Sequence, residues 1–386
     1  MIEIHGYCDE RFSPVREVFA RNFADKDEVG ASLALTVEGE MVVDMWAGHR
    51  DAAKSLPWEQ DTIVNVWSTT KTMSALCALV LADRGEIDLY APVTRYWPAF
   101  GQNGKEKIEV RHFMSHSAGL AGTDEPIRGE ALYDWERVVN ALERQAPWWE
   151  PGTASGYHAI TQGHLIGEVV RRVTGMSCGT FFRREIAEPL GADFHIGTAP
   201  EHFSRIGDLL PPGVSLGGAL AHEPSGRGGG EGRAASIAVR AFRSPFVRAE
   251  DAATAEWREA EIPAANGHGN ARSVARIQTV IANGGVSAGT RILSEAGCRA
   301  VFDEQTHGRD LVLKAPLTFG MGYALLHGQS PRELAFWGGW GGSSVVVAPQ
   351  SRMCIAYVMN RMEPSLLGDD RGVSLNRAAL AVMGRG

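Results

Sequence analysis

Segments rich in strand-forming residues occur at both ends of this chain and constrain its fold more than any other feature. Residues 31–37 and 41–46 are rich in strand formers, and Glu38-Gly39-Glu40 separates them, which is typical of a β-hairpin. Near the other end, residues 345–347 and 355–358 flank the turn Pro349-Gln350-Ser351. Terminal strands can pair with each other across a long insertion, so we predict a single antiparallel sheet.

Helical patterns fill most of the remaining chain. Ser13-Pro14 is typical of a helix start, because proline is favoured at the first helical position. Helical spacing also predicts helices after Ser68 and over residues 132–142, 160–173, 273–282 and 375–383, with Gly175 as a cap. The glycine-rich residues 225–232 predict a loop.

These elements predict an α+β fold, in which terminal helices flank the antiparallel sheet and a mainly helical lobe is inserted. The expected division is an α/β lobe of residues 1–60 and 265–386 and a helical lobe of residues 61–264. A cleft between two lobes is a usual place for a ligand, so we expect an active site there.

Composition and charge argue against several classes of protein. The chain has 386 residues, 44% hydrophobic and 22% charged, and its net charge of −8 does not predict nucleic-acid binding. No apolar run approaches the roughly 20 residues that span a bilayer, and the N-terminus lacks the pattern of a signal peptide. Five scattered cysteines without a C-x-x-C pair predict a reduced, cytoplasmic protein.

The segment Ser68-Thr69-Thr70-Lys71 places a hydroxyl and an amine three residues apart, just before an apolar run. In a helix the two side chains would share a face. A serine is a useful nucleophile only when a base takes its proton, and burial can lower the pKa of a lysine enough for that task. The S-x-x-K spacing therefore indicates acyl transfer, although a serine N-cap followed by a solvated lysine would leave the same pattern.

Two further segments could complete such a site. Tyr157 follows the turn-rich residues 151–156 and precedes a predicted helix, where its hydroxyl can face a cleft and move protons; otherwise its ring simply packs. Residues 337–343, Trp-Gly-Gly-Trp-Gly-Gly-Ser, lie where a strand is expected. Glycines there predict close approach by a ligand or another backbone, or a bulged edge strand.

In combination these segments resemble the family VIII carboxylesterases, relatives of class C β-lactamases and penicillin-binding proteins. Ser68-x-x-Lys71, Tyr157 and Trp337-Gly338-Gly339 carry the resemblance by their order and wide spacing. Accessory stretches extend it over roughly residues 15–360: Val29-Gly30-Ala31-Ser32-Leu33 with Gly39 and Val43-Asp44, residues 112–120, residues 266–273 and residues 319–323.

The resemblance implies a β-lactamase-like fold and a serine hydrolase that needs no cofactor and no metal. Ser68 would be the nucleophile, Lys71 the general base, and Tyr157 a general base and acid that serves the leaving group and the hydrolytic water. The oxyanion would lie between the backbone N–H groups of Ser68 and Trp340. The implied substrate-binding residues are Trp337, Gly338, Gly339 and Trp340.

Two departures from the penicillin-recognising pattern favour esters. Trp337-Gly338-Gly339 stands where those relatives have Lys-Thr-Gly, and tryptophan supplies no positive charge for a substrate carboxylate. Tyr157-His158-Ala159 replaces Tyr-x-Asn, which removes an amide contact to an amide-bearing substrate. We interpret His158 as a structural or rim residue and leave a catalytic contribution open.

Other types of hydrolase fit the sequence less well. His112 and His116 could share a helix face as metal ligands, but no third ligand and no H-E-x-x-H motif accompany them. Residues 115–119, Ser-His-Ser-Ala-Gly, do not match the G-x-S-x-G motif of α/β-hydrolases, because they lack its first glycine. β-Lactamase, D-amino-acid amidase or peptidase, and acyltransferase stay open, since all would acylate Ser68. A non-catalytic ligand-binding protein is the alternative from another class.

We therefore predict a carboxylesterase that cleaves short-chain, neutral carboxylic esters through a Ser68 acyl-enzyme. The expected partner is a small-molecule ester rather than a nucleic acid or a membrane. Assembly into a homo-oligomer stays open.

Overall fold

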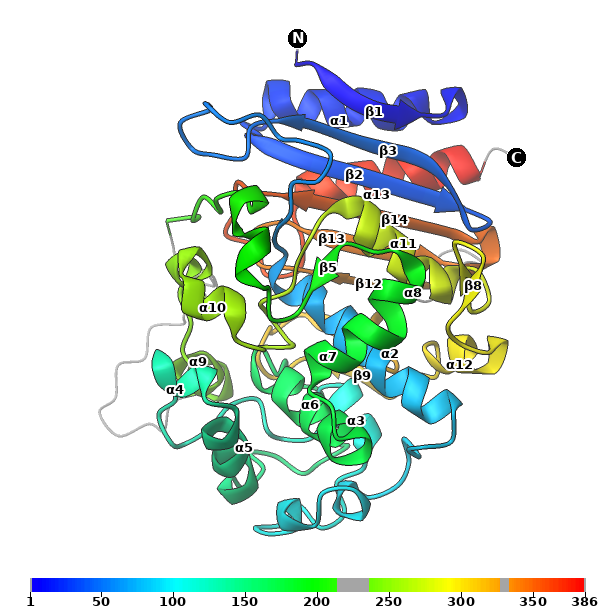
Figure 1. Ribbon diagram of the computed structural model, residues 1–386. Helices are drawn as coiled ribbons and strands as arrows, with labels where there is room; N and C mark the ends of the chain where they lie inside the picture. The colour runs from blue at the N-terminus through cyan, green and yellow to red at the C-terminus, as the bar shows by residue number, and fades with distance from the viewer. Residues whose placement is uncertain (1, 214–235, 327–332, 385–386) are drawn as a thin grey trace.

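The computed structural model describes residues 2–213, 236–326 and 333–384 (Figure 1). A nine-stranded antiparallel sheet lies at one end of the molecule, and a mainly helical region extends away from it. The predicted loop at residues 225–232 lies outside the described residues. Among the helices of the described part, none is long and apolar enough to cross a membrane.

The two ends of the chain meet in the middle of the sheet, as predicted. Strand β14 pairs with β2, from Met353 opposite Val37 to Met359 opposite Ala31. In spatial order the strands are β1 (Ile4–Cys8), β3 (Glu40–Gly48), β2 (Gly30–Val37), β14 (Met353–Met359), β13 (Ser344–Ala348), β12 (Leu334–Gly338), β11 (Ala324–Leu326), β10 (Pro316–Phe319) and β9 (Thr306–Arg309).

The predicted N-terminal hairpin is formed by β2 and β3. Glu38 and Gly39 form its turn, with φ angles of 53° and 90°. A two-residue turn with both φ angles positive matches the right-handed twist of the flanking strands, which explains the Glu-Gly pair at this point.

Helices cover both faces of this sheet. Helix α1 (Ser13–Asp25) and helix α13 (Asp370–Met383) pack against each other on one side, and α11 (Ala271–Ala282) contacts β2, β13 and β14 on the other (Figure 1). All residues of β13 and β14 are buried, as expected for strands enclosed on both faces. The predicted terminal helices and the α+β architecture are confirmed.

The helical region surrounds one buried helix, α2 (Thr70–Asp83), whose residues 70–81 are all buried. The other helices are α3 (Val110–Met114), α4 (Glu130–Tyr133), α5 (Trp135–Arg144), α6 (Thr161–Thr174), α7 (Cys178–Phe182), α8 (Glu188–Leu190), α9 (Ile237–Arg243), α10 (Ala255–Glu259) and α12 (Glu295–Ala300). A small sheet of β4 (Val64–Asn65), β6 (His268–Gly269) and β5 (Phe194–His195) and a pair of β7 (Val286–Ser287) with β8 (Thr290–Arg291) complete it.

Two local predictions need correction. The helix predicted over 132–142 is divided between α4 and α5, because Asp134 adopts an extended conformation and caps α5 by accepting the backbone N–H of Arg137. The strand expected at residues 337–343 ends at Gly338, and residues 339–343 form the turn into β13. This strand is not an edge strand, because β12 lies between β13 and β11. The division into two lobes stays a prediction.

Candidate active site

Ser68 lies in a tight turn that enters the buried helix α2. The turn spans Trp67–Thr69, and Trp67 has a φ angle of 47°, which is rare for a bulky side chain. Such strain persists only where the surroundings enforce it, and it recurs at functional sites. Here the enforcing contacts include a hydrogen bond of 2.8 Å from the backbone N–H of Val66 to the carbonyl of Gly267.

Lys71 extends from the first turn of α2 toward Ser68, as the spacing predicts. Its Nζ lies 3.1 Å from Ser68 Oγ, 2.7 Å from the carbonyl oxygen of Ala159 and 2.9 Å from that of Ala264. The side chain is 2% exposed, and no carboxylate is among its hydrogen-bond partners. Burial without a counter-charge holds the pKa of Lys71 well below its usual value of 10.5.

Tyr157 approaches the same oxygen from another segment of the chain. Its hydroxyl donates a hydrogen bond of 2.5 Å to Ser68 Oγ, and Lys71 Nζ lies 4.8 Å from the centre of its ring. Burial raises the pKa of Tyr157, although the Ser68 hydroxyl and the nearby Trp337 indole offset part of the rise. At neutral pH Tyr157 is therefore a phenol, and it can give a proton rather than take one.

The backbone N–H groups of Ser68 and Trp340 are the two predicted oxyanion donors. Neither donates a hydrogen bond to another backbone group in the described part of the chain. Trp340 lies in the turn after β12. This turn is close to the Ser68 turn, as shown by the distance of 5.0 Å between the ring centres of Trp340 and Trp67.

The glycines of residues 337–343 allow two backbones to approach closely. A Cβ on Gly339 would collide with the Val66 carbonyl oxygen, and one on Gly338 would lie 2.6 Å from the backbone nitrogen of Gly368. Close approach by another backbone, one of the sequence interpretations, therefore explains both positions. The role of this segment in substrate binding stays a prediction.

Trp337 occupies the interior of the site rather than its rim. It is 2% exposed, and its ring lies 5.4 Å from that of Tyr157 and 5.7 Å from that of His116. Trp340 is equally buried, at 1% exposure. Trp337 therefore fixes the orientation of the Tyr157 ring, and it brings no positive charge to the site.

His158 is held as a neutral structural residue. Its Nδ1 lies 2.6 Å from the Gly156 carbonyl, and its Nε2 accepts the backbone N–H of Leu120 at 3.1 Å. One ring nitrogen must then donate and the other accept, which leaves no proton to exchange. Burial lowers the pKa of His158 to about 3. The structural interpretation of this residue fits all these contacts.

His112 and His116 serve separate structural roles instead of binding a metal together. His112 Nδ1 accepts the backbone N–H of Glu109 and caps α3, whereas His116 lies beyond the end of α3 and accepts the N–H of His158. No cluster of three or more metal-ligating side chains is found among the described residues.

Sequence reasoning missed the residues that hold the site in place. Asp310, fully buried, accepts the backbone N–H groups of Tyr157, Val312 and Leu313 through one oxygen. The Lys71 acceptors Ala159 and Ala264 were missed too, because a backbone carbonyl leaves no trace in a side-chain pattern. An isolated aspartate gives an equally weak signal.

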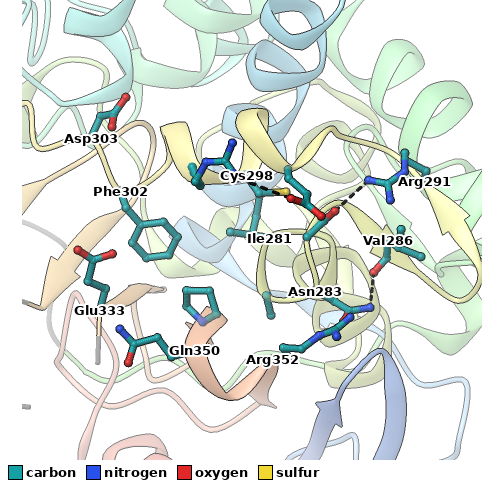
Figure 2. Close-up of a pocket in the computed structure, with 15 residues that line it drawn as sticks. Ile281, Asn283, Val286, Arg291, Cys298, Phe302, Asp303, Glu333, Gln350 and Arg352 are labelled. Carbon is teal, nitrogen blue, oxygen red and sulfur yellow. Dashed lines mark hydrogen bonds and ion pairs between the residues drawn. The ribbon is translucent and has the colours of Figure 1, made fainter. Parts of the chain in front are cut away.

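A groove of about 830 Å³ lies at the other end of α2. Figure 2 shows the side chains that line it. It borders α12, whose N-terminal Ser294 donates its N–H to Asp83 at the last turn of α2. A helix of 14 residues places this groove about 20 Å from Ser68. Burial raises the pKa of its Cys298 thiol to about 12, so this groove lacks an activated nucleophile of that kind.

The whole chain is similar to several known proteins. The Beta-lactamase family profile matches residues 15–378 of the chain. The chain is 37% identical to the esterase/beta-lactamase LipL of Mycobacterium tuberculosis, over 96% of this chain and 86% of that protein. Its structure is similar to a family VIII carboxylesterase (40% identity, TM-score 0.88, 99% and 100% of the two chains).

A penicillin-binding protein homologue from Caulobacter crescentus is also similar, with 36% identity and a TM-score of 0.86 over 98% of this chain and 100% of that one. The family profile and these full-length similarities confirm the β-lactamase-like fold expected from the sequence. The chain belongs to the beta-lactamase family, and within it is similar to the family VIII carboxylesterases.

Proposed function

We propose that this protein is a serine carboxylesterase that hydrolyses short-chain, neutral esters through an acyl-enzyme on Ser68. One observation carries the proposal: the Oγ of Ser68 lies within hydrogen-bond distance of both Lys71 Nζ and the Tyr157 hydroxyl. A nucleophile, a base with a depressed pKa and a second proton-handling group thus meet at one oxygen.

Because burial holds the pKa of Lys71 well below its usual value, we assign the protons before the reaction on the basis of a neutral lysine. A neutral Lys71 has two N–H donors, which fit the carbonyl oxygens of Ala159 and Ala264, and one lone pair, which then faces Ser68. In this state Ser68 Oγ, 3.1 Å from Lys71 Nζ, would donate its proton to that lone pair while it accepts the hydrogen bond of Tyr157. The lysine is therefore oriented as a base before any substrate arrives.

In acylation, Ser68 Oγ attacks the ester carbonyl carbon while its proton passes to Lys71. The carbonyl oxygen becomes an oxyanion, which the N–H groups of Ser68 and Trp340 would stabilise. When the bond to the alcohol oxygen breaks, Tyr157 protonates the leaving alkoxide and regains a proton from Lys71. Deacylation reverses the sequence: water attacks the acyl carbon while its proton passes through Tyr157 to Lys71. When the acyl bond breaks, the pair returns a proton to Ser68 Oγ, which releases the acid and restores free Ser68.

A neutral substrate is favoured by what surrounds Ser68. Lys71 is the basic side chain in contact with Ser68, and in its neutral form it offers no charge to a carboxylate. At the position of the lysine of Lys-Thr-Gly stands Trp337, buried against Tyr157. We also propose a cytoplasmic location and a small-molecule ester as the partner, without a nucleic acid or membrane partner; assembly into a homo-oligomer stays open.

The test is covalent labelling of Ser68. The protein is incubated with p-nitrophenyl acetate or a fluorophosphonate, and intact mass followed by peptide mapping locates the adduct. We expect one adduct on Ser68 and none in Ser68→Ala. Ser287→Ala is the matched control, because this buried serine bonds to the carbonyl of Arg276 in the β7–β8 region. Hydrolysis at the wild-type rate by Ser68→Ala would refute the proposal.

β-Lactam hydrolysis is the second candidate, because LipL carries both activities in its name. We expect nitrocefin, which is anionic, to be turned over much more slowly than p-nitrophenyl acetate. Equal rates for the two substrates would show that the missing positive charge at Trp337 does not govern substrate choice.

A further inference from the structure

The turn that carries Trp340 is intrinsically flexible and needs external support. Gly341 and Gly342 have φ angles of 99° and 134°, which only glycine adopts readily. Glycine loses more conformational freedom on ordering than other residues, so a fixed turn of this composition requires strong contacts. The backbone of Gly341 is held by the carbonyl of Ser365 and the N–H of Glu363, each at 2.9 Å.

A buried cation completes this support. Arg371 of α13 is 2% exposed, and its Nη2 donates a hydrogen bond of 2.9 Å to the carbonyl oxygen of Gly341. Two acidic side chains pair with the guanidinium: Nη1 lies 3.0 and 3.1 Å from the oxygens of Glu28, and Nη2 lies 2.5 Å from Asp369 Oδ2. Burial raises the pKa of Glu28 to about 7. The planar fork of an arginine can serve all these acceptors at once.

A chain of hydrogen bonds connects this guanidinium with the candidate oxyanion donor. The Gly341 carbonyl belongs to the same peptide group as the N–H of Gly342, and that N–H donates to the Gly339 carbonyl at 3.2 Å. The Gly339 carbonyl in turn belongs to the same peptide group as the N–H of Trp340. Arg371 and the Trp340 N–H are thus separated by two peptide groups joined by one hydrogen bond.

Inside a protein, successive hydrogen bonds in a chain of such bonds polarise one another. A charge-assisted bond to the Gly341 carbonyl makes the Gly342 N–H a stronger donor, and this polarises the second peptide in the same direction. The Trp340 N–H becomes both better oriented and a stronger donor. The close packing also explains Gly342, because a Cβ there would lie 2.8 Å from Arg371 Nη2.

We propose that Arg371 is a positioning residue for the oxyanion hole, which aligns and polarises the Trp340 N–H through the peptide groups of Gly341 and Gly339. The proposal rests on the proposed esterase function, because it concerns the same acylation site. Arg371 itself touches neither substrate nor Ser68 and acts only through this relay.

Arg371→Met and Arg371→Lys test the relay. Lysine keeps a positive charge beside Glu28 and Asp369 but lacks the planar fork that also reaches Gly341. The lysine variant therefore still tests the relay if Arg371→Met does not fold. Active sites are counted by the end point of fluorophosphonate labelling, which removes any loss of folded protein from the comparison. For each variant we measure kcat and KM for p-nitrophenyl acetate and Ki for 2,2,2-trifluoroacetophenone, which forms an oxyanion on serine.

We expect kcat/KM per active site to fall about 10- to 100-fold, less than the roughly 100- to 1000-fold typical of removing an oxyanion donor outright. Ki should rise by the same factor while KM changes little, because only the oxyanion uses the relay. Arg171→Met and Arg171→Lys are the controls: Arg171 binds the buried Glu168 on α6, away from the turn, and should leave kcat/KM and Ki unchanged.

Arg371 variants with wild-type kcat/KM and Ki per active site would overturn the relay alone. A wild-type protein without Ser68-dependent hydrolysis would instead overturn the proposed function, and this proposal with it. A rise in KM with unchanged Ki would mean that Arg371 acts on substrate binding and not on the oxyanion, which also overturns the relay.

Discussion

Ser343 joins the turn after β12 to the turn that carries the nucleophile, through a hydrogen bond of 2.8 Å from its Oγ to the Val66 carbonyl oxygen. The same hydroxyl lies 2.9 Å from Thr69 Oγ1. The two candidate oxyanion donors, on Ser68 and Trp340, belong to these two turns. One side chain therefore links the two turns, and its partners are far from it in the sequence.

Ser343→Ala should lower both activity and stability. The buried Val66 carbonyl loses its side-chain donor but keeps the backbone N–H of Thr69, so the expected cost is about 0.5–1.5 kcal/mol. The value of kcat/KM should also fall, because the two turns can separate. Urea denaturation and ester kinetics measure the two effects. Ser344→Ala is the control, because that neighbouring hydroxyl has no hydrogen-bond partner in the described structure. Equal losses in both variants would contradict the role given to Ser343.

Lys71→Arg should abolish ester hydrolysis although it preserves the positive charge. An arginine cannot give up its proton near neutral pH, so it cannot accept one from Ser68, and we expect a loss of about 100- to 10,000-fold in kcat. Single-turnover acylation followed by stopped flow is the measurement. A Lys71→Arg variant that kept the wild-type acylation rate would show that Lys71 acts as a cation and not as a base.

The pH dependence of acylation should report the depressed pKa of Lys71. Acylation requires neutral Lys71, so its rate should rise with pH and level off once the lysine has lost its proton. Because burial lowers this pKa well below 10.5, the plateau should begin well below the pH at which an ordinary lysine titrates. A pH profile of kcat/KM checks this, and a rate that still rises in proportion to hydroxide through the range of an ordinary lysine would contradict it.

Asp310→Ala should disable the site from a distance, whereas Asp310→Asn should largely preserve the fold. Alanine leaves three buried N–H groups without their acceptor, including that of Tyr157, and should cost at least about 2 kcal/mol of stability. Asparagine retains an acceptor oxygen, so the Tyr157 backbone stays in place. The measurements are the melting temperature and kcat of both variants. If the two substitutions lowered both quantities equally, the negative charge of Asp310 would be responsible and not its hydrogen bonds to the backbone.

The free energy of unfolding should fall as the pH drops below about 6.5, the ordinary pKa of a histidine. Burial lowers the pKa of His158 from 6.5 to about 3, so between these values the unfolded chain binds a proton that the folded chain does not. The contribution is therefore complete above about pH 6.5 and declines by up to about 1.4 kcal/mol per pH unit as the pH falls toward 3.

Urea denaturation of the wild type and of His158→Gln at about pH 7.5, 6 and 4.5, which span the unfolded-state pKa of histidine, isolates this contribution. Glutamine can still accept the Leu120 N–H but cannot titrate, so the variant should be less stable at the highest pH and lose less stability on acidification. Parallel pH curves for the two proteins would show that His158 is protonated in the folded state.

The pairing of the terminal strands and the positions of the main helices were predictable from the sequence. The hairpin of β2 and β3, the capped α6 and the helix after Ser68 depend on local rules, such as strand formers around a glycine turn and apolar residues at helical spacing. Those rules failed at residue 134, where one cap divides a helix, and at residue 339, where a strand becomes a turn. In both cases a single backbone conformation overrides the propensity of its neighbours.

The sequence by itself determined the chemistry that is available: a serine, a lysine at i+3, a distant tyrosine and a tryptophan where relatives carry a cation. Only the tertiary structure decided how these groups behave. The depressed pKa of Lys71 arises from burial, and its orientation from the carbonyls of Ala159 and Ala264. The relay from Arg371 depends on a helix at the far end of the chain packing behind the glycine turn. Desolvation and backbone hydrogen bonds belong to the folded chain as a whole, so no side-chain pattern encodes them locally.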